Sequence, residues 1–144
     1  MDWLRIVIDY GIIGLLIFLS IIAIGIAIER FYLFKNIKLE SFKDKKSLEL
    51  ELTKKIHLIA TIGSNAPYIG LLGTVLGIML TFYMIGKEGF MDTGRIMVGL
   101  ALALKATAVG LLVAIPAVSL YNFLLRKVKV LLLTWEIERE RKRI

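Results

Sequence analysis

The chain contains no cysteine and a single histidine, His57, among its 144 residues. The absence of cysteine excludes disulfides, thiolate catalysis, iron–sulfur clusters and cysteine-ligated zinc. One histidine makes no metal site unless several carboxylates converge on it, so we expect no metal and no cofactor. The sequence also lacks a glycine-rich phosphate loop followed by Lys and Ser/Thr, and a Ser–His–Asp set in suitable register. These absences predict that the protein is not an enzyme.

Apolar residues, by contrast, are abundant. They make up 58% of the chain, and the mean hydropathy is +0.77. A soluble domain has roughly 45–50% apolar residues, so the composition predicts a membrane protein. The net charge of +7 could indicate nucleic-acid binding, but Lys and Arg in a membrane protein usually mark cytoplasmic segments. We therefore expect the lipid bilayer, and not nucleic acid, as a partner.

Three charge-poor stretches predict three membrane spans, at residues 10–28, 58–86 and 96–125. Each is long enough to cross a hydrocarbon core that needs about 20 helical residues. The first stretch ends in "IERFYLF" and not in a small-residue cleavage site, so it is not a cleavable signal peptide by its flanks. The sequence therefore predicts an all-α integral membrane protein that forms one domain over residues 1–144.

The basic residues predict the orientation of these spans. Residues 29–57 carry eight Lys or Arg, and residues 126–144 carry seven. The remaining segments hold Arg5 before the first span and Lys87 and Arg95 between the second and third. Because positive charge marks cytoplasmic segments, we expect the N-terminus outside the cytoplasm and the C-terminus inside it.

The cytoplasmic segments have helical periodicity. Leu48, Leu52, Ile56 and Ile59 recur at steps of four, four and three and lead directly into the second span. Past the third span, similar spacing continues through Val128, Leu131, Leu132 and Trp135. We therefore expect the second and third helices to extend past the membrane and to pack on each other inside.

Small residues form a stripe along each of the last two spans. The second span has Gly63, Ala66, Gly70, Gly73 and Gly77, and the third has Gly99, Ala103, Ala106, Gly110, Ala114 and Ala117. Small residues let helix backbones approach closely in lipid. We expect Gly70, Gly73, Gly77 and Gly110 to serve tight helix packing, within or between subunits. Pro67 and Pro116 lie inside the same helices, where we expect a kink or an interrupted hydrogen-bond ladder.

Three threonines lie beside these stripes, Thr74, Thr81 and Thr107. A threonine hydroxyl in a span commonly bonds back to a carbonyl one turn earlier, which is the interpretation we favour for Thr81. For Thr74 and Thr107 the residues alone leave two interpretations open. Both hydroxyls either bond back to the helix or line a polar, water-accessible path.

Lys105 is the one formal charge inside the predicted spans. Intramembrane charge usually marks a functional site, because a central Lys costs about 2.5–3.5 kcal/mol on insertion scales. Residues 106–125 are long enough to cross alone, however, so Lys105 could equally lie at the outer interface and snorkel. At the inner end of the first span, Glu29 and Arg30 are expected to form a solvated boundary.

Two stretches together resemble a known family. "APYIGLLGTVLGIMLTF" in the second span and "ALKATAVGLLVAIPAVSLYN" in the third closely resemble the ExbB/TolQ family of inner-membrane proton-channel proteins, with MotA as a more distant relative. "IERFYLF" at the end of the first span fits as well. The resemblance covers nearly the whole chain and is strongest to ExbB.

The resemblance implies a bacterial inner-membrane pentamer around a dimer of a single-span partner, ExbD, which supplies a membrane aspartate. Proton flow would drive rotation, and a TonB-like protein would pass the work to outer-membrane transporters. A TolQ-like role in envelope maintenance is the alternative. By motif, Thr74 and Thr107 match the two family threonines that face the partner's aspartate. No carboxylate lies inside the three predicted spans, so a partner must supply the titrating group.

Two features depart from the family pattern. Many members carry Glu five residues before the second threonine, where this chain has Leu102, and Lys105 stands two residues before Thr107. Either this branch does without that carboxylate or Lys105 changes the electrostatics of the channel mouth. The short first cytoplasmic loop argues against MotA. Two alternatives remain. One is a membrane scaffold or passive channel, which would tolerate Thr→Val at both positions, and the other is a small transporter or integral-membrane enzyme.

Overall fold

The computed structural model of the chain describes residues 2–89 and 92–143. The regular elements are four α-helices, α1 (Asp2–Asn36), α2 (Lys45–Thr53), α3 (Ile56–Glu88) and α4 (Thr93–Arg143), with a short 3-10 helix at Leu39–Ser41. The described residues contain no strand, and α1, α3 and α4 are long and apolar enough to cross a membrane. The prediction of an all-α chain with three apolar helices is confirmed.

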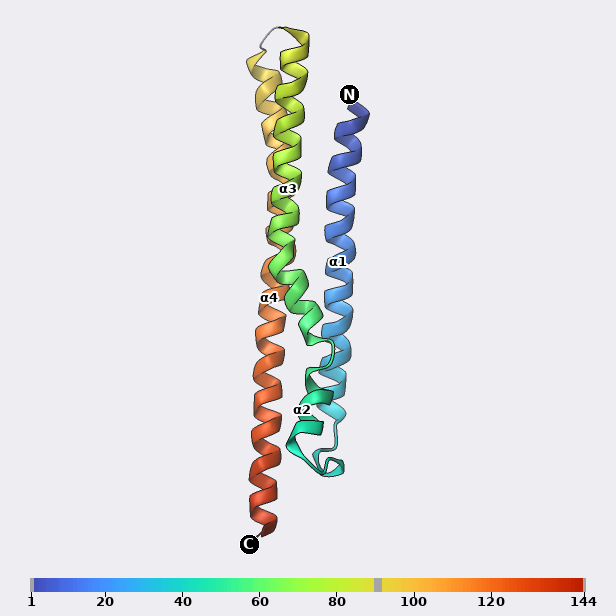
Figure 1. The fold of residues 1–144 in the computed structure, drawn as a ribbon, viewed down its shortest axis with the longest axis vertical. Helices are drawn as coiled ribbons and strands as arrows, with labels where there is room; N and C mark the ends of the chain where they lie inside the picture. Colours follow the sequence, from blue (N-terminus) through green and yellow to red (C-terminus); the bar gives the residue numbers. More distant parts are fainter. Residues whose placement is uncertain (1, 90–91, 144) are drawn as a thin grey trace.

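The three long helices form an elongated bundle (Figure 1). Helix α1 descends from the N-terminus, α3 returns upward and α4 descends again, so that α3 is antiparallel to both of its neighbours. Helices α3 and α4 lie side by side, and α1 packs against both. Helix α2 lies against α4 near the lower end of the bundle.

A glycine caps the C-terminal end of α3. Helix α3 ends at Gly89, whose φ of 77° is left-handed and whose N–H donates to the Ile85 carbonyl at 3.1 Å. Glycine is favoured at this position because it has no Cβ to clash. Helix α4 then continues for 51 residues, about 75 Å at 1.5 Å per residue. It is therefore far longer than a membrane span requires.

The second long helix does not extend unbroken below the span, and that prediction was wrong. Residues 45–53 form the separate helix α2, and the chain turns at Lys55, which has a left-handed φ of 69°. The turn brings the buried side chains of Leu48 and Leu52 onto the same cluster as Ile56 and Ile59. The helical spacing was read correctly, but burial of this apolar face is achieved by folding the segment back.

Arg30 also differs from its prediction as part of a solvated boundary. It is only 3% exposed, and it donates to the Glu51 carbonyl at 2.8 Å and to Glu29 at 2.8 Å. The Glu51 carbonyl lies in the last turn of α2, where helix carbonyls lack partners within the helix. Arg30 thus ties α1 to the end of α2, while Glu29 remains exposed and also pairs with Lys55 at 3.1 Å.

The two prolines lie within continuous helices. Pro67 is inside α3 and Pro116 inside α4. Figure 1 shows α3 bending in its lower part. This bend directs the start of α3 toward α1 and α2, as expected where proline removes an internal hydrogen bond.

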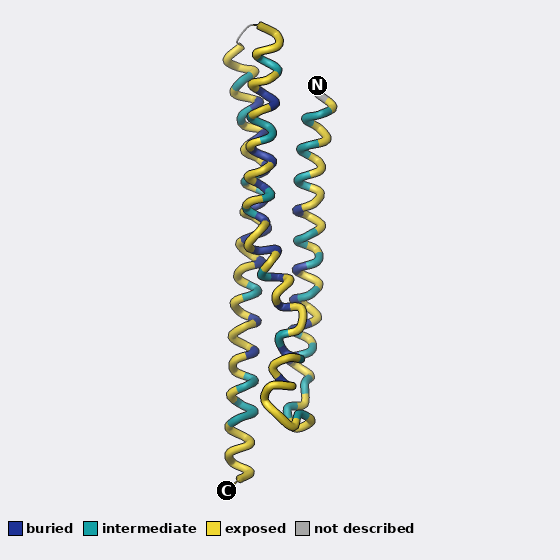
Figure 2. Tube along the Cα trace, in the orientation of Figure 1, coloured by how far each residue is buried: buried dark blue, intermediate teal, exposed yellow. Residues whose placement is uncertain are grey.

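Buried residues follow the inner faces of the helices, and the outer faces are exposed (Figure 2). The upper part of the bundle is lined by glycine and alanine, whereas its lower part is filled by larger side chains. Phe34, Leu48, Leu52, Ile59, Leu124 and Val128 belong to this lower cluster. The small residues hold α3 and α4 at close range above, and the aliphatic cluster anchors α2 below.

Candidate functional site

Gly70 and Gly110 lie at the closest contact between α3 and α4. A Cβ placed on Gly70 would lie 2.6 Å from the Ala106 carbonyl oxygen and 3.1 Å from the Gly110 Cα. A Cβ on Gly110 would lie 2.7 Å from the Ala66 carbonyl oxygen. Only glycine fits on each side, because the opposing atoms belong to the backbone and cannot rotate away.

The next turns of α3 continue this contact. A Cβ on Gly73 would lie 2.7 Å from the Ala106 Cβ and 3.0 Å from Ile12 of α1, and one on Gly77 would lie 2.8 Å from the Ala103 Cβ. The small stripes of α3 and α4 therefore pack on each other within one chain. Gly73 also admits the side chain of Ile12 into the contact.

Thr74 and Thr107 meet at this contact. The buried Thr74 hydroxyl lies 2.9 Å from the Ala103 carbonyl oxygen of α4 and 3.4 Å from the Gly70 carbonyl oxygen of its own helix. It also makes a hydrogen bond with the Thr107 hydroxyl. The 3.4 Å bond back to α3 is the longer of the two bonds to carbonyls, so Thr74 is engaged chiefly across the helix pair.

The donor hydrogens and acceptor lone pairs of the two hydroxyls determine which further hydrogen bonds this pair can make. A hydroxyl carries one hydrogen and two acceptor lone pairs. When Thr74 donates to the Ala103 carbonyl, Thr107 must donate to Thr74. The Thr107 oxygen then keeps its lone pairs for a hydrogen bond from a protonated group. Rotation of the hydroxyls would reverse the direction and let the pair donate to an anion. The pair can therefore hydrogen-bond either protonation state of a carboxyl group without titrating itself.

Thr81 has a different environment, one helical turn from Gly77. Its hydroxyl donates back to the Gly77 carbonyl at 2.9 Å, as the sequence predicts. It also accepts a hydrogen bond of 2.6 Å from Arg5 of α1. Thr81 thus connects α3 to the N-terminal part of α1.

Lys105 is paired with a carboxylate that sequence reasoning did not place beside it. Its ammonium lies 2.9 Å from Asp9 of α1, and the two side chains are 47% and 24% exposed. Neither unpaired snorkelling nor an isolated intramembrane charge describes this arrangement. Asp9 immediately precedes the charge-free window of the first span, and α1 continues through it as regular helix.

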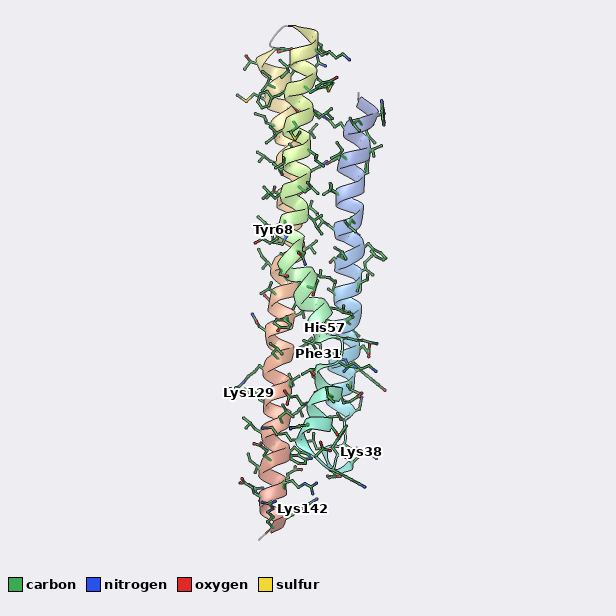
Figure 3. All side chains as sticks on the ribbon, in the orientation of Figure 1. Phe31, Lys38, His57, Tyr68, Lys129 and Lys142 are labelled. Carbon is green, nitrogen blue, oxygen red and sulfur yellow. The ribbon has the colours of Figure 1, made fainter. Side chains whose placement is uncertain are left out.

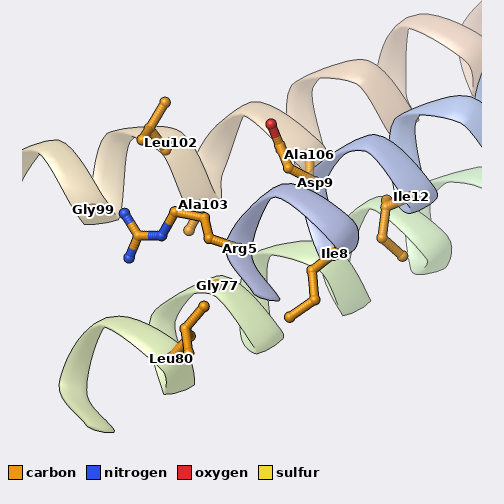
Figure 4. A pocket seen from close by; sticks show the side chains of 11 residues that line it. Arg5, Ile8, Asp9, Ile12, Gly77, Leu80, Gly99, Leu102, Ala103 and Ala106 are labelled. Atoms are coloured by element: carbon orange, nitrogen blue, oxygen red, sulfur yellow. The ribbon is translucent and has the colours of Figure 1, made fainter. Parts of the chain in front are cut away.

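A small cavity lies beside this ion pair, between α1, α3 and α4 (Figure 4). Its volume is about 40 Å³, and Arg5 and Asp9 line it with Gly73, Gly77, Leu102, Ala103 and Ala106 among others. About 10–15 Å³ is enough for a water molecule when polar partners are present. Leu102 lines this cavity with an apolar side chain, at the position where many family members have Glu.

The structure brings together most of the predicted site residues. Thr74, Thr107 and the four glycines share the α3–α4 contact, whereas Lys105 pairs with Asp9 of α1. Arg5 and Asp9 were not among the predicted site residues. Their four-residue spacing puts them on one helix face, which was the available signal. Among residues 2–89 and 92–143, no His, Asp and Glu cluster could hold a metal ion.

Comparison with known proteins decides the family. The profile of the MotA/TolQ/ExbB proton channel family matches residues 32–137. The chain belongs to this family. It is 60% identical over 136 residues to the biopolymer transport protein ExbB of Aquifex aeolicus, covering 94% of this chain and 92% of that protein.

Two relatives from Helicobacter pylori show the same likeness. The putative biopolymer transport protein ExbB-like 2 is 59% identical over 130 residues, covering 90% of this chain and 87% of its own. The biopolymer transport protein ExbB of strain J99 is 49% identical over 131 residues, with 91% and 90% coverage. The resemblance to ExbB is confirmed, and the three apolar helices fit the multi-pass membrane architecture of a proton channel family.

Proposed function

We propose that this chain is the channel-forming subunit of a proton-driven inner-membrane motor. It works with an ExbD-like single-span partner, whose membrane carboxylate accepts and releases the protons. Five copies surround the partner, and a TonB-like protein transmits the work to outer-membrane transporters. In this proposal Thr74 and Thr107 face the partner's carboxylate and guide the proton.

The observation that supports this role most is the hydroxyl pair at the α3–α4 contact. Thr74 and Thr107 come from two different helices, and the Ala103 carbonyl orients Thr74. Such a pair stabilises a partner's carboxyl group in both its protonated and its ionised form, as described above. In this proposal the partner provides the titrating carboxylate, since the three predicted spans contain none.

The exposed surface supports an assembly in lipid. Within the most apolar window of each long helix, only 22–28% of the residues are buried inside the chain. The exposed large side chains include Tyr68, Leu72, Met79, Leu104 and Leu112. An apolar surface of this extent needs lipid or other subunits to cover it. One chain with three helices is too small to enclose a partner, so several copies are required.

The charge distribution supports a cytoplasmic C-terminus. Figure 3 shows Lys38, Lys129 and Lys142 in the lower half of the molecule, away from the N-terminus. This half contains both of the basic segments, residues 29–57 and 126–144. By the positive-inside rule this end lies in the cytoplasm and the α3–α4 turn faces the periplasm.

The proposal predicts that proton conduction needs the partner and both hydroxyls. We would co-express the chain with a single-span, Asp-containing partner from the same genome, determine the native mass of the solubilised complex, and measure proton uptake into proteoliposomes. Thr74→Val and Thr107→Val keep the side-chain shape and remove the hydroxyl. Each should lower partner-dependent flux about tenfold or more, since a lost charge-assisted hydrogen bond contributes about 1.5–3 kcal/mol.

Thr134→Val is the matched control. The Thr134 hydroxyl bonds back to the Val130 carbonyl at 2.8 Å in the lower part of α4, so its loss should leave flux unchanged. A monomer or dimer that ignores the partner in mild detergent would contradict the motor. Full flux in both span variants would instead indicate a scaffold or passive channel, in which the small stripes serve only assembly.

A further inference from the structure

Cationic side chains outnumber carboxylates at the cavity between α1, α3 and α4 and in its immediate surroundings. Arg5 and Asp9 line it, and the second cation, Lys105, pairs with Asp9 without lining the cavity itself. Asp9 is 2.9 Å from Lys105 and is the only acidic residue among those that line the cavity. The pair also lies close to the hydroxyl site, because the cavity wall includes Ala103, whose carbonyl accepts from Thr74.

We propose that Asp9 is a positioning residue for proton conduction, whose negative charge cancels that of Lys105 across α4 from the Thr74–Thr107 pair. This inference rests on the proposed function. Without Asp9, the ammonium would repel every proton that approaches the hydroxyl pair. With Asp9 in place, the side chains of the channel mouth carry less positive charge. Asp9 itself neither carries the proton nor contacts the partner's carboxyl group.

The size of the effect follows from helix geometry. Lys105 and Thr107 are two residues apart and so point to opposite sides of α4, about 10 Å from each other across the helix. At that distance and an effective dielectric constant of about 20, an uncompensated positive charge slows a cation by roughly tenfold. An uncompensated negative charge has the opposite sign and favours the proton.

The opposite effects on proton flux of removing Asp9 and of removing Lys105 distinguish the proposal from two other roles for the same ion pair. If the pair served only to hold α1 against α4, removal of either partner would be equally harmful. If Asp9 carried the proton, its removal would be harmful whatever stands at position 105. Charge cancellation alone predicts unequal single variants and recovery when both charges are removed.

The test measures proton flux per assembled complex in proteoliposomes with the single-span partner. Asp9→Asn should lower flux about tenfold, whereas Lys105→Met should conduct at the unmodified protein's rate or faster. The double variant Asp9→Asn/Lys105→Met should recover to within about threefold, and Asp9→Glu should conduct normally. Asp92→Asn is the matched control, because Asp92 is exposed before the first residue of α4 and its side chain accepts a hydrogen bond from the Gly94 amide.

Three results would overturn the inference: normal flux in Asp9→Asn, equal losses in Asp9→Asn and Lys105→Met, or a double variant as inactive as Asp9→Asn. If Asp9→Asn fails to assemble, the Lys105→Met and double variants still decide, because only charge cancellation predicts full flux in the first and recovery in the second. Absence of flux in the unmodified complex would defeat the proposed function and this inference together. Normal flux there with no effect of Asp9→Asn would defeat the inference alone.

Discussion

Gly70→Ala is the sharpest probe of the α3–α4 contact, because it adds a single methyl group against rigid backbone. The new Cβ would lie 2.6 Å from the Ala106 carbonyl oxygen and 3.2 Å from the Thr107 Cα. Ordinary contact begins near 3.4 Å, so the helices must separate locally by about 0.8 Å. A gap of that size forfeits a quarter to a half of the dispersion energy of each affected atom pair.

The expected loss of stability follows from two opposing effects. Overpacking of a close contact costs about 1–3 kcal/mol, and replacement of a helical glycine by alanine returns about 0.5–1 kcal/mol. We therefore expect Gly70→Ala to lower the free energy of unfolding by about 1–2 kcal/mol. Because Thr107 is one of the displaced residues, the variant should also weaken the Thr74–Thr107 hydrogen bond and reduce flux.

Gly25→Ala provides the control in the same membrane-spanning environment. A Cβ on Gly25 of α1 would meet no atom within 4 Å, so only the gain in helix propensity remains. Unfolding is followed by far-ultraviolet circular dichroism of the solubilised chain as denaturing detergent replaces mild detergent. If Gly70→Ala proved as stable as Gly25→Ala, α3 and α4 would not pack as closely as described, and the proposed geometry of the hydroxyl pair would be wrong.

Two further predictions concern the lower end of the bundle. Arg30→Met removes the buried donor to the Glu51 carbonyl. This loss should lower the free energy of unfolding by about 1.5–3 kcal/mol and speed amide hydrogen exchange throughout α2. Lys55→Met removes an exposed ion pair and should change the exchange rate of α2 little. Hydrogen bonds from the Ser47 hydroxyl and amide lower the pKa of Asp44 below its usual 3.8. Because the folded pKa is the lower one, this cap stabilises α2 above pH 3.8 and is lost as the pH falls through the folded value. The Ser47 amide chemical shift should therefore titrate below pH 3.8, and it should not do so in Asp44→Asn.

Much of the architecture was predictable because it depends on local composition. Long uncharged stretches in lipid must form helices, since each backbone group needs an internal partner. The three- and four-residue steps of the glycines and alanines determine which face of α3 and α4 is small. The spacing of Leu48, Leu52, Ile56 and Ile59 likewise predicted a shared apolar face, which the structure buries in one cluster.

The errors arose where two distant segments meet. Helical spacing is the same on both sides of Lys55, so periodicity could not reveal the left-handed turn that separates α2 from α3. Arg30 reads as a boundary charge until α2 folds back and its Glu51 carbonyl accepts from the guanidinium. For Lys55 the deciding feature is a single backbone angle. For Arg30 it is a partner 21 residues away in the sequence.

By itself, the sequence determined that the chain is a membrane protein with three helices, two small-residue faces and a family likeness, because hydropathy, residue size and motif order are properties of consecutive residues. Only the tertiary structure decided that Thr74 bonds to Ala103 and Thr107 across two helices. It alone decided that Lys105 is paired with Asp9. Both contacts depend on how far the packed helices are shifted along their axes relative to each other. That shift is set by the packing of glycine against backbone, so the sequence of one helix does not reveal which side chains of another it meets.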